Sequence, residues 1–162
     1  MKTILLLFAL VATTAFAQNP YELAILTQAN QMAAGLINND VKTVAAFTHP
    51  KIVQAMGGAE KMEAAVKKSG PSVRIVDVTF GKPSVVVKSG GELQCVVPQR
   101  ATFQLPQGSV KSSSSLIAFS FDEGKNWVFA DTSPGVEKMR KVIPGISSKL
   151  VIPARQQPTM IK

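Results

Sequence analysis

Hydrophobic positions recur with two different periods, which divide the chain into a helical first part and a strand-rich second part. From Asn19 to Asp40 they recur at steps of three and four, which predicts an amphipathic helix with Asn19 as N-cap and Pro20 in the first helical position. A second helix is expected after Asp40 and should end before Pro50, because the residue preceding a proline disfavours the helical region. A third helix is expected in "AEKMEAAVKK".

After Pro71 apolar and polar residues alternate with period two, which is typical of β-strands with one buried face. The long segment "ELQCVVPQRATFQL" predicts a strand in which Pro98 marks a bulge, a bend or an edge position. A short helix is expected in "VEKMRKV" and a last strand at Leu150–Ile152. The other expected strands are "SVRIVDVTF", "SVVVK", "SVKSSSSLIAFSF" and "WVFADT".

This order of elements predicts an α+β fold, in which N-terminal helices pack on a strongly curved antiparallel β-sheet and a short C-terminal helix and tail follow. The curvature is expected because strands of ten or more residues carry Pro or Gly interruptions. A bent sheet that is closed by helices forms a cone with a cavity inside. The pattern therefore predicts a cone-shaped domain.

The first residues have the composition of a secretory signal peptide. "MKTILLLFALVATTAFAQ" has a basic start, a short apolar run and an A-x-A site, so we expect cleavage after Ala17 and export to the periplasm or the medium. The apolar run is short of the roughly 20 residues that span a bilayer. Removing 17 of the 162 residues leaves 145, enough for one domain. We expect that domain over residues 18–143 and a basic tail over 144–162.

Charge is unevenly distributed in this basic chain, whose formal net charge is +8. From Val136 onward six basic residues stand against Glu137 alone. Such a tail suits an acidic polymer or anionic lipid, or is a solvated surface. Export and the lack of interleaved aromatic residues argue against nucleic acid as a partner.

Cys95 is the only cysteine, so it forms no internal disulfide. We expect it as a small hydrophobe in a buried strand.

The element order resembles the NTF2-like superfamily, which includes ketosteroid isomerases and polyketide-cyclase-like proteins. The segments "NNDVKTVAAFTHPKIVQAMGGAEKMEAAVKK", "VTFGKPSVVVKSGGELQCVVPQ" and "GKNWVFADTS" look like the helices and strands of small exported bacterial members. The resemblance covers Pro20 to Thr132. It implies a cone whose cavity binds an apolar molecule, and in enzymatic members holds an acid or base.

Four residues are candidates for binding a ligand in such a cavity: Tyr21, His49, Arg100 and Asp131. Tyr21 and His49 are the only residues of their kinds. His49 is either a base at the cavity mouth or a turn residue at a helix end. Asp131 either turns into the cavity or closes an Asx-turn in "DTSPG". Arg100 either binds an anionic head group or occupies a strand edge.

The stretch "SFDEGKNW" fits the Asp-box, a motif best known from sialidases and other carbohydrate-active proteins. It occurs once, and 145 residues are too few for a propeller of four-stranded blades. Small secreted ribonucleases carry similar hairpins but need a histidine near the loop, which "DEGKN" lacks. We therefore interpret the motif as a structural hairpin, in which Asp122 accepts backbone N–H bonds and Gly124 takes positive φ. Its members are Ser120, Asp122, Gly124 and Trp127.

Three functional hypotheses follow. The first is an exported, non-catalytic domain that binds a small apolar ligand or a protein partner in or around the cavity. The second is an isomerase- or hydrolase-like enzyme that uses a cavity acid or His49. The third is an envelope or matrix protein that docks an acidic polymer through its basic tail. We assign no catalytic residue, cofactor or metal site, and expect that a homodimer could form through the sheet.

Overall fold

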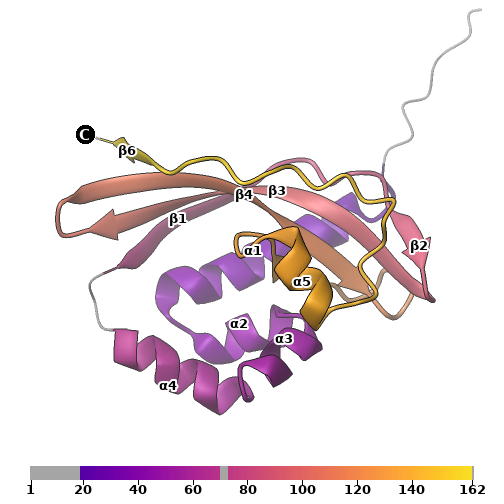
Figure 1. The fold of residues 1–162 in the computed structure, drawn as a ribbon, viewed down its shortest axis with the longest axis horizontal. Helices are drawn as coiled ribbons and strands as arrows, with labels where there is room; N and C mark the ends of the chain where they lie inside the picture. The colour runs from indigo at the N-terminus through magenta and orange to yellow at the C-terminus, as the bar shows by residue number, and fades with distance from the viewer. Residues whose placement is uncertain (1–18, 70–72, 162) are drawn as a thin grey trace, which may run out of the picture.

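The structure is a computed structural model that describes residues 19–69 and 73–161, so the predicted signal peptide lies outside the described residues. Within them five helices and a six-stranded, antiparallel, open sheet form an α+β fold, which confirms the predicted fold class (Figure 1). The helices are α1 (Glu22–Asn38), α2 (Val41–Phe47), α3 (Pro50–Ala55), α4 (Ala59–Ser69) and α5 (Val136–Val142). The strands are β1 (Arg74–Phe80), β2 (Val87–Ser89), β3 (Glu92–Leu105), β4 (Gly108–Ser120), β5 (Val128–Asp131) and β6 (Thr159–Ile161).

Helix α1 begins later than its start signal predicts. The Asn19 side chain accepts the N–H of Tyr21 at 3.0 Å, and the Asn19 carbonyl accepts the N–H of Glu22 at 3.0 Å. These bonds close a turn around Pro20, so the predicted first helical position of Pro20 was wrong. The helix ends at Asn38 and is capped by Asn39, whose φ is 55°. Its apolar stripe is buried at Ile25, Ala29, Met32 and Ala33.

Strand β3 is the centre of the sheet, because it pairs with β1, β2 and β4. Its pairing with β4 runs without interruption through Pro98 opposite Ser115, so no bulge occurs at Pro98. On the other side of β3, Pro98 lies between the stretches paired with β1 and β2 and has no ladder partner, as the predicted edge position requires. The irregularity lies instead in β1, between Ile75 and Asp77. The Pro98 carbonyl accepts the N–H of Gly81 at 2.8 Å, just after β1 ends. The missing N–H of the proline therefore faces the end of β1, where no ladder bond is needed.

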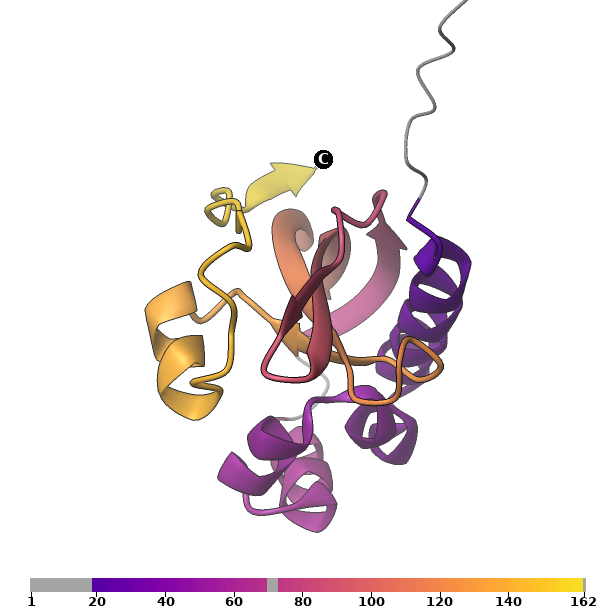
Figure 2. The same cartoon turned by 90° about the vertical axis from the view of Figure 1, so that its right-hand side faces the viewer.

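The two faces of the sheet bury two separate apolar clusters. The face we call inner packs on α1 through Cys95, Val97 and Leu116, together with Trp127 and Phe129. The face we call outer packs on α5 and the segment after it, and its cluster contains Val96, Ile117, Phe119, Ala130, Met139, Ile143, Ile146 and Leu150. Figure 2 shows α1 and α5 on opposite sides of the sheet. The alternation of period two in β3 and β4 produces both clusters.

The predicted strand at Leu150–Ile152 was wrong. The Leu150 N–H donates to the Ser147 carbonyl at 3.3 Å in a turn, and its side chain is buried in the outer cluster. The chain then continues across the sheet and pairs at β6 with Ser109–Lys111 of β4. Figure 1 shows this last segment running along the sheet to the C-terminus.

A candidate ligand pocket between the helices and the sheet

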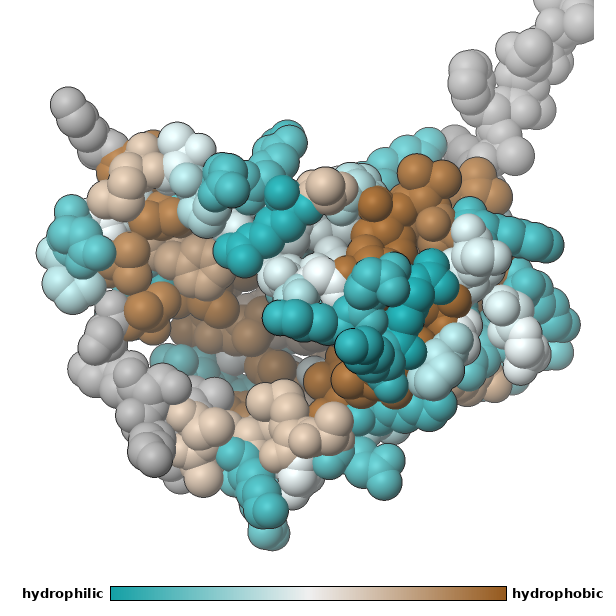
Figure 3. All heavy atoms as spheres, viewed as in Figure 1, coloured by the Kyte–Doolittle hydropathy of each residue, from teal (hydrophilic) through white to brown (hydrophobic). Residues whose placement is uncertain are grey.

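A pocket of about 420 Å³ lies between the helices and the inner face of the sheet. Helices α1 to α4 supply one wall, β3, β4 and β5 supply another, and α5 borders it. Figure 3 shows hydrophobic residues gathered around the hollow between the sheet and the helices below it. The lining is mainly apolar and includes Met32, Leu36, Ile52, Met62, Leu116 and Phe129.

The polar end of the pocket is built by Gln99 and Asp131. The register places Gln99 opposite Ser114, and Leu116, two residues along β4, opposite Asp131. The Gln99 side-chain amide donates to the Ser114 hydroxyl at 3.0 Å and to the Asp131 carboxylate at 3.4 Å. Turning this amide over would place its oxygen against the carboxylate. The amide nitrogen therefore faces Asp131.

The other atom of this amide has no partner. Gln99 is 9% exposed, and its Oε1 is fully enclosed without a hydrogen bond to any residue that the structure describes. A buried acceptor of this kind calls for an explanation, because most buried polar atoms are paired. The mainly apolar pocket is therefore lined by one residue, Gln99, whose amide oxygen has no partner among the described residues.

Asp131 takes both of the positions that its sequence context suggested. Its Oδ1 accepts the backbone N–H of Ser133 at 2.8 Å and the Ser133 hydroxyl at 2.7 Å, which is an Asx-turn. Its other oxygen faces Gln99, and the residue lines the pocket together with Lys138. Asp131 is thus held in place by the turn at the end of β5 while one oxygen points to the polar end of the pocket.

His49 lies outside this lining. It is the N-cap of α3, where Nδ1 accepts the N–H of Lys51 at 3.2 Å, and its own backbone N–H donates to the Phe129 carbonyl at 2.9 Å. The ring is buried against Phe119, with centroids 4.7 Å apart. Burial, and secondarily the nearby Lys51 charge, lower its pKa to about 4. The imidazole is therefore a neutral acceptor in a helix cap.

Tyr21 and Arg100 lie in two further places. Tyr21 packs on the inner cluster with its ring centroid 5.8 Å from that of Trp127. Arg100 projects from the opposite, outer face of β3, where it is exposed. Among the four predicted ligand-binding residues, only Asp131 lines this pocket. Gln99 is not among the residues predicted from the sequence, although a polar residue between the inward-facing Val97 and Ala101 is a signal that alternation could have shown.

The Asp-box segment forms a closely bonded loop between β4 and β5. Asp122 accepts the Asn126 backbone N–H at 2.9 Å and the Ser120 hydroxyl at 2.9 Å. The Ser120 hydroxyl accepts the N–H of Gly124 at 2.8 Å. Gly124 has a φ of 89°, and its carbonyl accepts the Trp127 indole N–H at 2.9 Å. All four motif residues therefore serve the loop itself.

Neither a metal cluster nor a membrane-spanning helix occurs in the described residues. Within residues 19–69 and 73–161, no three His, Cys, Asp or Glu side chains come together in a way that could hold a metal ion. No helix in the described part combines the length and apolar character needed to cross a bilayer. No protein-family model, curated protein or solved structure matches the chain.

Proposed function

We propose that the protein binds a small, largely apolar molecule in the pocket between its helices and the inner face of the sheet. The observation that carries this proposal is the unpartnered Oε1 of Gln99, a residue that lines the polar end of a mainly apolar pocket. Leaving a buried acceptor unsatisfied costs about 1–3 kcal/mol. A ligand that donates one hydrogen bond to this oxygen removes that penalty, while its apolar part gains from burial against the walls.

The size and position of the pocket support the same conclusion. Its volume of about 420 Å³ lies within the range of about 300–1,000 Å³ that is common for small-molecule sites. Helices that cover one face of a sheet, with a pocket between them, also agree with the NTF2-like cone that the resemblance implies. The proposal therefore includes an NTF2-like cone. It also includes export of the protein, with cleavage of a signal peptide after Ala17. N-terminal sequencing of the mature protein should then begin at Gln18.

Binding is tested with a pocket-filling variant. Ala55 lines the pocket from α3, so Ala55→Phe should obstruct it, whereas Ala46→Phe changes an exposed position of α2 outside the lining. The fluorescence of N-phenyl-1-naphthylamine should rise with native protein and with the Ala46 variant, and much less with the Ala55 variant. Equal binding by both variants, or none by the native protein, would refute the proposal.

The role of Gln99 is tested with a matched pair of competitors. Decanol carries a hydrogen-bond donor, whereas decyl methyl ether does not. Decanol should displace the fluorescent probe from native protein at the lower concentration, and Gln99→Leu should remove that difference while circular dichroism shows the fold retained. A preference for decanol that persists in Gln99→Leu would show that another group recognises the donor.

A further inference from the structure

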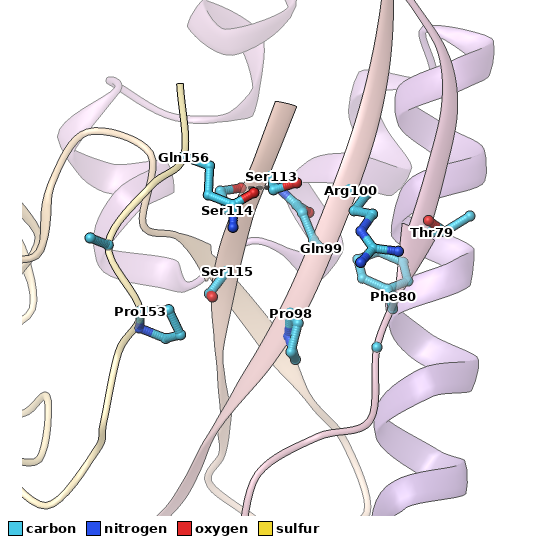
Figure 4. A pocket seen from close by; sticks show the side chains of 12 residues that line it. Thr79, Phe80, Pro98, Gln99, Arg100, Ser113, Ser114, Ser115, Pro153 and Gln156 are labelled. Carbon is cyan, nitrogen blue, oxygen red and sulfur yellow. Dashed lines mark hydrogen bonds between the residues drawn. The ribbon is translucent and has the colours of Figure 1, made fainter. Parts of the chain in front are cut away.

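We propose that the outer face of the sheet carries a second binding site, a cleft that takes a sugar acid: a hydroxyl-rich molecule with one carboxylate. The cleft opens on the other side of the sheet from the apolar pocket, with Gln99 bordering both, and its volume is about 270 Å³. Figure 4 shows its lining side chains arriving from neighbouring strands and from the C-terminal segment that crosses the sheet. The proposal does not depend on ligand binding in the inner pocket.

The register of the sheet builds the floor of the cleft. Thr79 of β1 lies opposite Arg100 of β3, and Arg100 lies opposite Ser113 of β4, so the three form one row across three strands. Pro98 and Ser115 form the next row on the same face. Three hydroxyl groups and one guanidinium are thereby brought to one surface.

The C-terminal segment supplies the wall. The backbone N–H of Gln156 donates to the Ser113 carbonyl at 3.2 Å, which holds this segment beside β4. Pro153 and Gln156 then line the cleft, and the Gln156 side chain extends from the segment toward β4 (Figure 4). The wall therefore adds an amide that can both donate and accept hydrogen bonds.

The polar groups of the cleft have unused hydrogen-bonding capacity. The Arg100 guanidinium forms no hydrogen bond or ion pair with any residue that the structure describes, and neither the Ser113 nor the Ser115 hydroxyl bonds to another described residue. Ser115 is only 2% exposed, and in Figure 4 its hydroxyl lies between Pro98 and Pro153. A hydroxyl of such a buried residue, without an internal partner, is available to a polar ligand.

The charge of the cleft selects the ligand class. Arg100 is the only charged residue in its lining, so one negative charge on the ligand matches it. On the same face Arg74 and Lys111 lie on nearby rows and outnumber Asp77, which keeps the surroundings positive. A planar guanidinium suits a carboxylate, since it can donate two parallel hydrogen bonds. The surrounding hydroxyl and amide groups suit the hydroxyls of a sugar.

The volume limits the ligand to about one sugar unit. At about 30 Å³ per water molecule, the cleft holds roughly nine waters. This leaves room for a single acidic monosaccharide, or for one such residue of a longer polymer that extends into solvent. This site differs from the predicted docking of an acidic polymer through the basic tail, because here Arg100 on the sheet takes the charge.

The test is calorimetric titration of the purified protein with glucuronate, with glucose and inorganic phosphate as comparisons. We expect glucuronate to bind and glucose to bind much more weakly. Arg100→Gln should weaken glucuronate binding about tenfold or more, because hydrogen bonds between charged groups are stronger than neutral ones. Lys111→Gln removes a cation from the same face outside the cleft, and should leave the affinity within about twofold.

A second pair of variants tests the hydroxyl contacts. Ser115→Ala should weaken glucuronate binding without lowering the melting temperature, because its hydroxyl has no partner among the described residues. Ser112→Ala changes a serine opposite Ala101, outside the cleft, and should change nothing in binding. Absence of glucuronate binding, equal loss in the Arg100 and Lys111 variants, or tighter binding of phosphate than of glucuronate would each overturn the proposal.

Discussion

The side chain of Gln28 on α1 is bonded to the backbone of Trp127 at the end of the Asp-box loop. Its Oε1 accepts the Trp127 N–H at 2.7 Å, and its amide nitrogen donates to the Lys125 carbonyl at 3.1 Å. One side chain thus satisfies two loop groups that are far away in the sequence. The loop between β4 and β5 is therefore joined to the first helix as well as to its own strands.

Gly124→Ala should be strongly destabilising. Gly124 has a φ of 89°, and an added Cβ would overlap the Tyr21 ring. A left-handed backbone costs about 1–2 kcal/mol for an L-residue, and overpacking costs about 1–3 kcal/mol more. Urea unfolding should show a loss of about 2–5 kcal/mol. The control is Gly91→Ala, which has a φ of 87° but open space around it and should lose only the backbone part.

Asp122→Ala should lower the melting temperature because it removes the acceptor of the Asn126 and Ser120 bonds. These bonds, those from Asn126 first, hold the Asp122 pKa below its usual 3.8. The carboxylate therefore stabilises the fold above that pH, and its contribution is lost as the pH falls through the lowered pKa. The difference from native protein should be large at pH 7 and shrink below about pH 4.

The control for Asp122 is Glu123→Ala, which removes the same charge from the next residue. Glu123 is exposed and its carboxylate forms no hydrogen bond with any described residue. Equal melting temperatures for the two variants at pH 7 would contradict the interpretation of Asp122 as a structural residue of the loop.

His49 should make the protein less stable in mild acid. Its folded pKa of about 4 lies below the usual 6.5, so between these values the unfolded chain binds a proton that the folded chain does not. The free energy of unfolding should therefore fall as pH is lowered from 6.5 to 4, by about 1–2 kcal/mol once solvent screening is allowed for. His49→Asn keeps an acceptor for the Lys51 N–H and does not titrate. Urea unfolding at several pH values should show a flatter profile for this variant, and an unchanged profile would argue against the role of His49.

Cys95 should be unreactive in the folded protein. It has no exposed surface, and burial raises the pKa of its thiol to about 12. Only the thiolate attacks disulfide reagents, so dithionitrobenzoate at about pH 8 should give almost no colour until urea unfolds the chain. Rapid reaction of the native protein would mean that β3 opens readily.

The features that depend on neighbouring residues could be predicted from the sequence. The bonds of Ser120, Asp122, Gly124 and Trp127 join groups within one short loop, so the residue types alone indicate the geometry. The helical period of α1 also depends only on local spacing, but the stripe predicted from Leu23 through Ala29 and Ala33 was wrong at its start, because Leu23 is exposed and Ile25 is buried instead. The contact of Gln28 with the loop depends on how α1 crosses the sheet, and no local pattern encodes that crossing.

The same distinction holds for the candidate sites. Asp131 is predictable because its turn sequence is local, whereas Gln99 becomes important only when β3, β4 and β5 align. The sequence allows His49 to be a base or a turn residue, and its burial by Phe119 decides its protonation. Leu150 has the sequence context of a strand, but its N–H is taken up by a turn with Ser147, which the alternation of apolar residues does not show.

The C-terminal segment also covers part of one edge of strand β4. On the side of β4 away from β3, β5 covers Leu116–Phe119 and β6 covers Ser109–Lys111. Between these two paired stretches the Gln156 N–H donates to the Ser113 carbonyl, and the Thr132 N–H donates to the Ser115 carbonyl. The β5 segment and the C-terminal segment therefore together cover this edge of β4.

An uncovered edge of this length is a template on which a second molecule can add its own strand, and long exposed edges are sites of aggregation. The last residues of the chain pair with the part of β4 that β5 is too short to reach. Strand β6 therefore occupies backbone groups of Ser109–Lys111 on which such an added strand would otherwise form.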